Sequence, residues 1–135
     1  KESMEPLFVR YSVNLVVAGH VHAYMRTKPV ANGKVNNLGA KGAPEYILIG
    51  DGGNHEGHNK KFLNAVPEEW VEVRDGHVFG FGLLEISNKT HAKWQWVKNV
   101  DEGTTKIHDE GYITNQLFIQ DDREEWGSMH SDDSF

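Results

Sequence analysis

A short apolar run at Asn14–Gly19 constrains the fold of this chain more than any other feature. It reads Asn-Leu-Val-Val-Ala-Gly and contains no charged residue, which is typical of a strand buried on both faces of a sheet. Apolar residues at positions 4, 7, 8 and 11 have helical spacing and predict an amphipathic helix over residues 2–12. Ser3 is placed to cap this helix, and Pro6 fits its first turn. A helix followed by a buried strand indicates the α/β class.

The rest of the chain predicts further strands. A second apolar run, Tyr46–Gly50, ends in the turn sequence Asp51–Asn54. Residues 55–76 are polar and predict a loop or short helix, with a helix start at 67–70. Phe79, Phe81 and Leu83 then alternate with glycines, and Ala92, Trp94 and Trp96 alternate with polar residues after a turn at residues 88–89. These two segments predict an antiparallel hairpin with one buried aromatic face.

The composition argues against several functions. The formal net charge is -6, and an acidic surface repels phosphate backbones, so no nucleic-acid partner is expected. No run of about eighteen apolar residues is present, so no membrane span is expected. The chain has no cysteine, which excludes disulfides and thiolate metal sites. It opens Lys-Glu-Ser-Met without an apolar signal core, and we expect a fragment or a processed product.

His20 and His22 are the main candidates for chemistry. They follow the first buried strand, and ligands gather at the carboxyl ends of strands in open α/β sheets. In extended backbone, residues two apart point to the same side, so two imidazoles can serve two metal ions about 3.5–4 Å apart. A His-X-His pair alone is more often solvated or satisfied in a core, and that reading stays open on spacing alone.

Four segments in order resemble purple acid phosphatases. Met4–Leu7 and Val16–Tyr24, with its Gly-His-Val-His sequence, resemble the last metal-ligand block of that family. Tyr46–Gly57 is similar to its Gly-Asp-Gly-Gly-Asn segment, and Phe79–Glu85 and Thr90–Trp94 are similar to its closing strands. The chain departs from the family pattern at Met25, where Glu is usual, and at His55, where Arg is common.

The resemblance implies a fold and a division of the chain. It implies the C-terminal part of a metallophosphoesterase β-sandwich, with mixed sheets flanked by helices and antiparallel strands at the end. Residues 1–30 would end a calcineurin-like metallophosphoesterase domain, residues 44–105 would form the purple acid phosphatase C-terminal region, and residues 106–135 would form an acidic tail.

The resemblance also implies a binuclear metal centre. His20 would bind the divalent ion (Zn, Mn or Fe(II)) and His22 the Fe(III), while the other ligands would come from a missing N-terminal half. The implied reaction is hydrolysis of phosphate monoesters by an acid phosphatase, with the isolated segment inactive. The implied location is secreted or vacuolar/lysosomal. The resemblance is also compatible with a homodimer. The alternatives are another binuclear phosphoesterase, for diesters or nucleotides, and a non-catalytic interaction module.

Other residues carry weaker signals. Tyr24 and Arg26 follow His22 closely and would either border the site or serve the structure. Asn88 begins an Asn-Lys-Thr glycosylation sequon at a predicted turn. Asp51–Asn54 favours a tight turn over the two alternatives, an anion-binding nest and a calcium loop. His55 and His58 are interpreted as loop residues. His91 is interpreted as part of a packed strand face with Trp94 and Trp96, and no role is predicted for the histidines at positions 77, 108 and 130.

Overall fold

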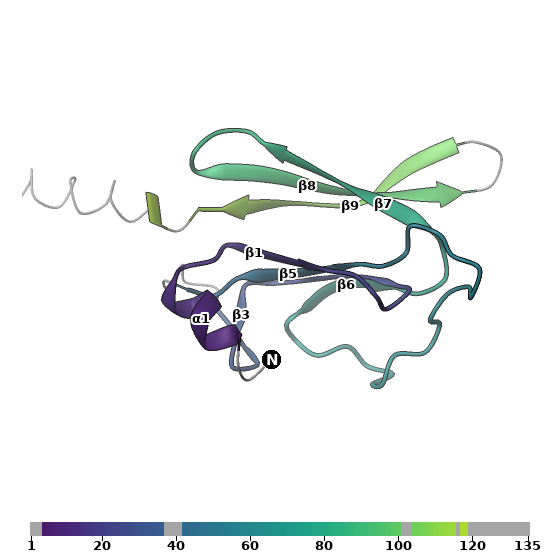
Figure 1. Cartoon of the computed structure of the whole chain (residues 1–135), viewed down its shortest axis with the longest axis horizontal. Helices are drawn as coiled ribbons and strands as arrows, with labels where there is room; N and C mark the ends of the chain where they lie inside the picture. The colour runs from purple at the N-terminus through teal and green to yellow at the C-terminus, as the bar shows by residue number, and fades with distance from the viewer. Residues whose placement is uncertain (1–3, 37–41, 101–103, 116, 119–135) are drawn as a thin grey trace, which may run out of the picture.

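The structure is a computed structural model that describes residues 4–36, 42–100, 104–115 and 117–118. Two layers of strands pack face to face, and helix α1 lies on the outer side of one layer (Figure 1). The elements are α1 (Glu5–Arg10), β1 (Leu15–Ala18), β2 (Tyr24–Thr27), β3 (Val30–Ala31), β4 (Lys34–Val35), β5 (Glu45–Ile49), β6 (Val71–Asp75), β7 (Gly80–Ile86), β8 (His91–Val100) and β9 (Thr104–Thr114).

The layer beside α1 is a four-stranded mixed sheet in the order β1-β5-β2-β6. β1 runs parallel to β5, and β2 is antiparallel to both β5 and β6. The other layer is a three-stranded antiparallel sheet in the order β7-β8-β9, and β3 and β4 form a small ribbon. The predicted α/β fold, a mixed sheet that ends in antiparallel strands, is confirmed.

Helix α1 is shorter than predicted. It begins at Glu5 with Met4 as N-cap and without a side-chain capping hydrogen bond, while the proposed cap Ser3 lies outside the described residues. Pro6 sits in the first turn as predicted, where the missing N–H leaves no helical hydrogen bond unmade. The Glu5 side chain is buried, and its Oε1 accepts a hydrogen bond from the Asn32 backbone N–H at 2.8 Å.

Strand β1 is not buried on both faces, contrary to the prediction. It lies at the edge of the mixed sheet with β5 as its single neighbour, and the Val17 side chain is 52% exposed. An all-apolar strand is normally covered on both faces. β1 therefore presents apolar surface that nothing in the described part of the chain covers.

The aromatic hairpin forms, and its predicted face is buried on β8 but not on β7. Trp94 and Trp96 are buried between the sheets, whereas Phe81 and Leu83 are about half exposed on the outer face of β7. A β-carbon on Gly82 would lie 1.9 Å from the Trp94 ring, so the glycines of β7 make room for the indoles. The predicted alternation is present on both strands. The core assignment is confirmed for Trp94 and Trp96 and is wrong for Phe81 and Leu83.

Five strands were not predicted: β2, β3, β4, β6 and β9. β6 lies where a loop or short helix was expected, and residues 67–70 form a turn instead of a helix start. β9 pairs along its length with β8, so the tail predicted for residues 106–135 begins inside a strand. The acidic residues from Asp121 onward lie outside the described residues.

A buried carboxylate joins the two sheets. Asp109 on β9 accepts hydrogen bonds from Arg26 Nε and Nη2 at 2.7 and 2.8 Å and from the Tyr24 hydroxyl at 2.6 Å. Trp94 Nε1 donates to the Tyr24 oxygen at 2.8 Å, and the Tyr24 ring stacks on Trp96 with centroids 4.0 Å apart. Burial alone would raise the pKa of Asp109, but the bonds from Arg26 and Tyr24 outweigh it and lower that pKa.

We expect Asp109→Ala to destabilise the fold by about 3–5 kcal/mol, because Arg26 and Tyr24 lose their buried acceptor. Because the pKa of Asp109 is lowered on folding, its contribution is complete above the unfolded value of 3.8 and is lost as the pH falls through the folded value. Urea denaturation measures both effects. The matched control is Glu110→Ala, at an exposed position next along β9, and equal losses in the two variants would contradict the assignment.

Glu45 should give the opposite pH dependence. It lies 3.9 Å from Arg26 Nη1, yet burial outweighs that attraction and raises its pKa to about 7. The folded state then binds more protons than the unfolded state between pH 4.5 and about 7, so stability falls as the pH rises through this window. We expect Glu45→Gln to remove that fall in denaturation curves, while the exposed Glu69→Gln leaves it in place. A fall that persists in Glu45→Gln would assign it to another group.

Candidate metal centre

His20 and His22 lie in a tight loop between β1 and β2, at the carboxyl end of the parallel strands β1 and β5. Val21 N–H donates to the Gly19 carbonyl at 3.0 Å and Ala23 N–H to the Val21 carbonyl at 2.8 Å. These short-range bonds bend the backbone, so the extended geometry predicted for the pair is wrong. Their place at the end of the parallel strands agrees with the prediction.

His20 is exposed and has a strained backbone. Its φ is 76°, in the left-handed region that side chains other than glycine rarely adopt. Strain of this kind costs on the order of 1–3 kcal/mol and persists where the surroundings enforce it. The conformation follows from the turn at Gly19–Val21, which carries the imidazole to the surface beyond the end of the sheet.

His22 is partly buried, and its ring is held by the loop that follows β5. Its Nδ1 lies 3.1 Å from the Gly57 carbonyl oxygen and 3.8 Å from Glu56 Oε2. A carbonyl only accepts hydrogen bonds, so Nδ1 carries the proton in this contact and Nε2 keeps its lone pair in the neutral ring. Metal-binding histidines are oriented by contacts of this type.

The turn Asp51–Asn54 directs its acidic group into the fold. The Asp51 side chain is fully buried, and its Oδ2 accepts a hydrogen bond from Trp96 Nε1 at 2.8 Å. Gly80 N–H donates to the Asp51 carbonyl at 3.0 Å. Burial raises the pKa of Asp51, and the bond from Trp96 opposes the rise only in part. This carboxylate therefore serves the contact between the two sheets.

The other candidates are scattered. Tyr24 and Arg26 belong to the buried Asp109 contacts between the sheets, the structural one of their two predicted roles. His55 is exposed, and the His58 ring lies against Phe79 with centroids 3.9 Å apart. Asn88 is exposed at the β7–β8 turn, where its Oδ1 accepts bonds from the backbone and hydroxyl of Thr90.

The histidine pair fits a metal centre only as a partial ligand set. Neutral imidazole nitrogens suit zinc and iron. Within residues 4–36, 42–100, 104–115 and 117–118, however, no group of three or more metal-binding side chains comes together. His20 and His22 can each supply one ligand, and further ligands have to come from outside this described part. The sequence did not predict that the Gly57 carbonyl contacts His22. The one signal for this contact was the glycine-rich segment in which Gly57 lies.

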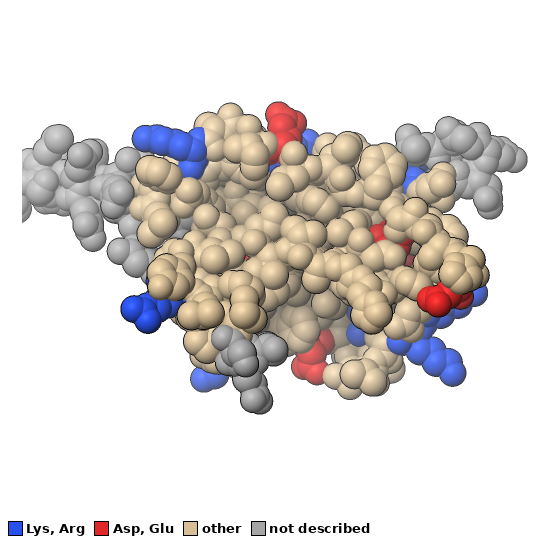
Figure 2. Space-filling view, in the orientation of Figure 1, with Lys and Arg blue, Asp and Glu red and all other residues tan. Residues whose placement is uncertain are grey.

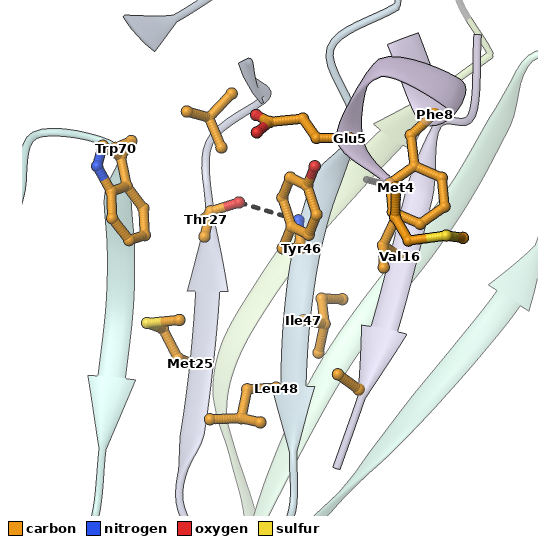
Figure 3. A pocket seen from close by; sticks show the side chains of 12 residues that line it. Met4, Glu5, Phe8, Val16, Met25, Thr27, Tyr46, Ile47, Leu48 and Trp70 are labelled. Carbon is orange, nitrogen blue, oxygen red and sulfur yellow. Dashed lines mark hydrogen bonds between the residues drawn. The ribbon is translucent and has the colours of Figure 1, made fainter. Parts of the chain in front are cut away.

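An apolar pocket of about 440 Å³ lies beneath α1, on the face of the mixed sheet opposite the β7-β8-β9 sheet (Figure 3). Its lining includes Phe8 from the helix and Val16, Met25 and Leu48 from the strands. Met25, the departure from the family pattern, lines this pocket. Among the described residues, no helix is long and apolar enough to cross a membrane.

We expect neutral His22 to carry its ring proton on Nδ1, because that nitrogen faces the Gly57 carbonyl. NMR of the imidazole nitrogens distinguishes the two tautomers. The exposed His55 serves as a comparison in the same spectrum. A proton on Nε2 of His22 would show that the ring is not oriented for a metal at that nitrogen.

Residues 43–110 match the protein family described as iron/zinc purple acid phosphatase-like protein C. Purple acid phosphatase 18 of Arabidopsis thaliana is 47% identical over 76% of this chain, which covers 22% of the relative. The Fe(3+)-Zn(2+) purple acid phosphatase 12 of the same plant is 40% identical over 84% of the chain and 25% of the relative. The chain thus spans about a quarter of the length of these relatives.

A solved structure shows the same fold. The structure of purple acid phosphatase PPD1 from yellow lupin (Lupinus luteus) seeds matches with a TM-score of 0.70 and 23% identity, over 87% of this chain and 21% of the lupin chain. At that identity, the structural match shows the fold, and the sequence match over residues 43–110 shows the family. The chain belongs to the purple acid phosphatase family.

Proposed function

We propose that this chain is the C-terminal part of an acid phosphatase that hydrolyses phosphate monoesters at a binuclear metal centre. The observation that carries the proposal is the His22 ring, whose Nδ1 faces the Gly57 carbonyl and whose Nε2 remains available for a metal. Family membership supplies the reaction class, since the relatives matched are purple acid phosphatases.

His20 and His22 would each hold one ion of the pair. The name of the Fe(3+)-Zn(2+) relative supports iron with zinc, and Mn or Fe(II) in place of zinc is the alternative. The family resemblance implies His22 on the iron and His20 on the divalent ion. Such a pair of ions polarises phosphoryl oxygens and lowers the pKa of bound water. The part of this chain in that chemistry is to place two neutral imidazoles at the end of the parallel strands.

A larger catalytic unit would complete the site. Strand β1 is an uncovered apolar edge beside the histidine loop, and the middle of the face drawn in Figure 2 carries few charged side chains. In the segment after β5, the buried atoms Asp51 Oδ1, Asn54 Nδ2 and His58 Nδ1 lack hydrogen-bond partners within the described residues. Surfaces of this kind are normally covered by other parts of a protein. We infer that the missing part supplies the remaining ligands and that the segment alone is inactive.

The substrate class is proposed as monoesters, with diesters or nucleotides as the alternative of another binuclear phosphoesterase. The third alternative is a non-catalytic interaction module, and the departure from the family pattern at Met25 would favour it. That side chain lines the apolar pocket beneath α1, on the opposite side of the sheet from sheet β7-β8-β9. A methionine there has a packing role, so the substitution does not argue against catalysis.

A secreted or vacuolar/lysosomal location is part of the proposal. The family resemblance implies it, and Asn88 is exposed at a turn where a glycan can be attached. Glycosylation at Asn88 would be tested by peptide-N-glycosidase treatment of the protein from its natural host, with Asn88→Gln as the control that no longer shifts.

Metal content and turnover of the full-length protein test the central proposal. We expect two metal ions per chain and hydrolysis of a phosphate monoester at acidic pH. We expect His20→Ala and His22→Ala each to lose one ion and to reduce turnover to background, because each removes one metal ligand. The matched control is His77→Ala, at an exposed turn before β7, which should retain both ions and full turnover.

A metal-free wild type, or histidine variants that keep both ions, would contradict the proposal. Hydrolysis of diesters in preference to monoesters, with both ions bound, would instead favour the second phosphoesterase class. These outcomes are separable because ion content and substrate preference are measured independently.

A further inference from the structure

The carboxyl end of β5 passes against the histidine loop at backbone distance. A β-carbon on Gly50 would lie 2.0 Å from the Val21 carbonyl oxygen and 2.8 Å from its carbonyl carbon. Both are backbone atoms, so no side-chain rotation relieves the overlap. The φ of Gly50 lies outside the left-handed region, and what this position requires is space.

Further contacts fix the same loop from the segment after β5. Gly50 N–H donates to the Ala23 carbonyl at 3.3 Å, and Asn59 N–H donates to the His22 carbonyl at 2.9 Å. The Gly57 carbonyl accepts the hydrogen bond from His22 Nδ1. Residues 50–59 therefore contact the backbone on both sides of His22 as well as its ring.

The end of β5 is itself anchored to the second sheet. Asp51 follows Gly50 directly, and its buried carboxylate and carbonyl accept bonds from Trp96 and Gly80. A side chain at position 50 would thus press on a strand end that is tied to sheet β7-β8-β9. The histidine loop is exposed at His20 and Val21, so we expect it to yield before the anchored end of β5 does.

We propose that Gly50 and Gly57 are positioning residues for the histidine pair: Gly50 gives the loop its place against β5, and the Gly57 carbonyl orients the His22 ring toward a metal ion. The inference rests on the proposed function for the metal ion and goes beyond it by assigning the orientation of a ligand to the glycine-rich segment. Neither glycine touches the reacting atoms, so neither is a catalytic residue.

Glycines in the same stretch provide matched controls. Gly52 has an ordinary φ, like Gly50, but a β-carbon there meets nothing within 4 Å. Gly53 and Gly57 both have positive φ, 112° and 80°, and both have open space at the β-carbon position. Only Gly57 of that second pair contacts His22, so the two alanine variants share the backbone strain and differ in the contact.

The test compares Gly50→Ala with Gly52→Ala in the full-length protein, using zinc binding to the metal-free protein and the proton position on the His22 ring. Loss of a contact that orients a metal ligand typically lowers metal affinity about 10–100-fold. We expect that loss in Gly50→Ala, together with loss of the Nδ1 proton signal, and unchanged values in Gly52→Ala. Added zinc should restore turnover in Gly50→Ala, because every ligand is still present.

Wild-type zinc affinity in Gly50→Ala would overturn the inference. If Gly50→Ala does not fold, the second pair decides: a larger loss of affinity in Gly57→Ala than in Gly53→Ala supports the inference, and equal values overturn it. The outcome also separates this inference from the proposed function. A wild type that binds two ions and loses one in His22→Ala keeps the proposed function even where the glycine variants show no effect.

Discussion

The buried Asp109 carboxylate is the interaction on which the arrangement of the two sheets depends. It holds Arg26 and Tyr24 of β2 from the opposite sheet, and β2 begins two residues after His22. The bond from Trp96 to Asp51 fixes the end of β5 in the same way. The start of β2 and the end of β5, which both contact the histidine loop, are thus bonded to the β7-β8-β9 sheet. These buried contacts fix the position of the loop.

This arrangement explains how strands remote from the proposed metal ligands can position them. A charge buried between sheets is costly unless its hydrogen bonds are satisfied, and Asp109 receives three. The stacked Tyr24 and Trp96 rings fill the space beside it. The closing strands therefore act as a scaffold for the short exposed loop that carries the two proposed metal ligands.

Local patterns predicted much of the fold but little of the site geometry. The apolar runs of β1 and β5 and the alternation of β7 and β8 are visible in the sequence, and so are the two histidines. β9 was missed because it places Asp109 and Gly111 toward the core, which is stable only with Arg26, 83 residues away along the chain. The Gly57 contact to His22 joins residues 35 apart, and no periodicity reveals it. β6 did offer a signal, since Val71 and Val73 alternate with charged residues.

Anomalous diffraction from crystals of the full-length protein, recorded at the iron and zinc absorption edges, tests the central claim most directly. The proposed function predicts two separate ions, one bound to His20 and one to the Nε2 atom of His22, each at about 2.0–2.1 Å for a zinc–nitrogen bond. The Nδ1 atom of His22 should remain on the Gly57 carbonyl. Ions bound without either histidine, or a His22 ring that binds metal through Nδ1, would contradict it.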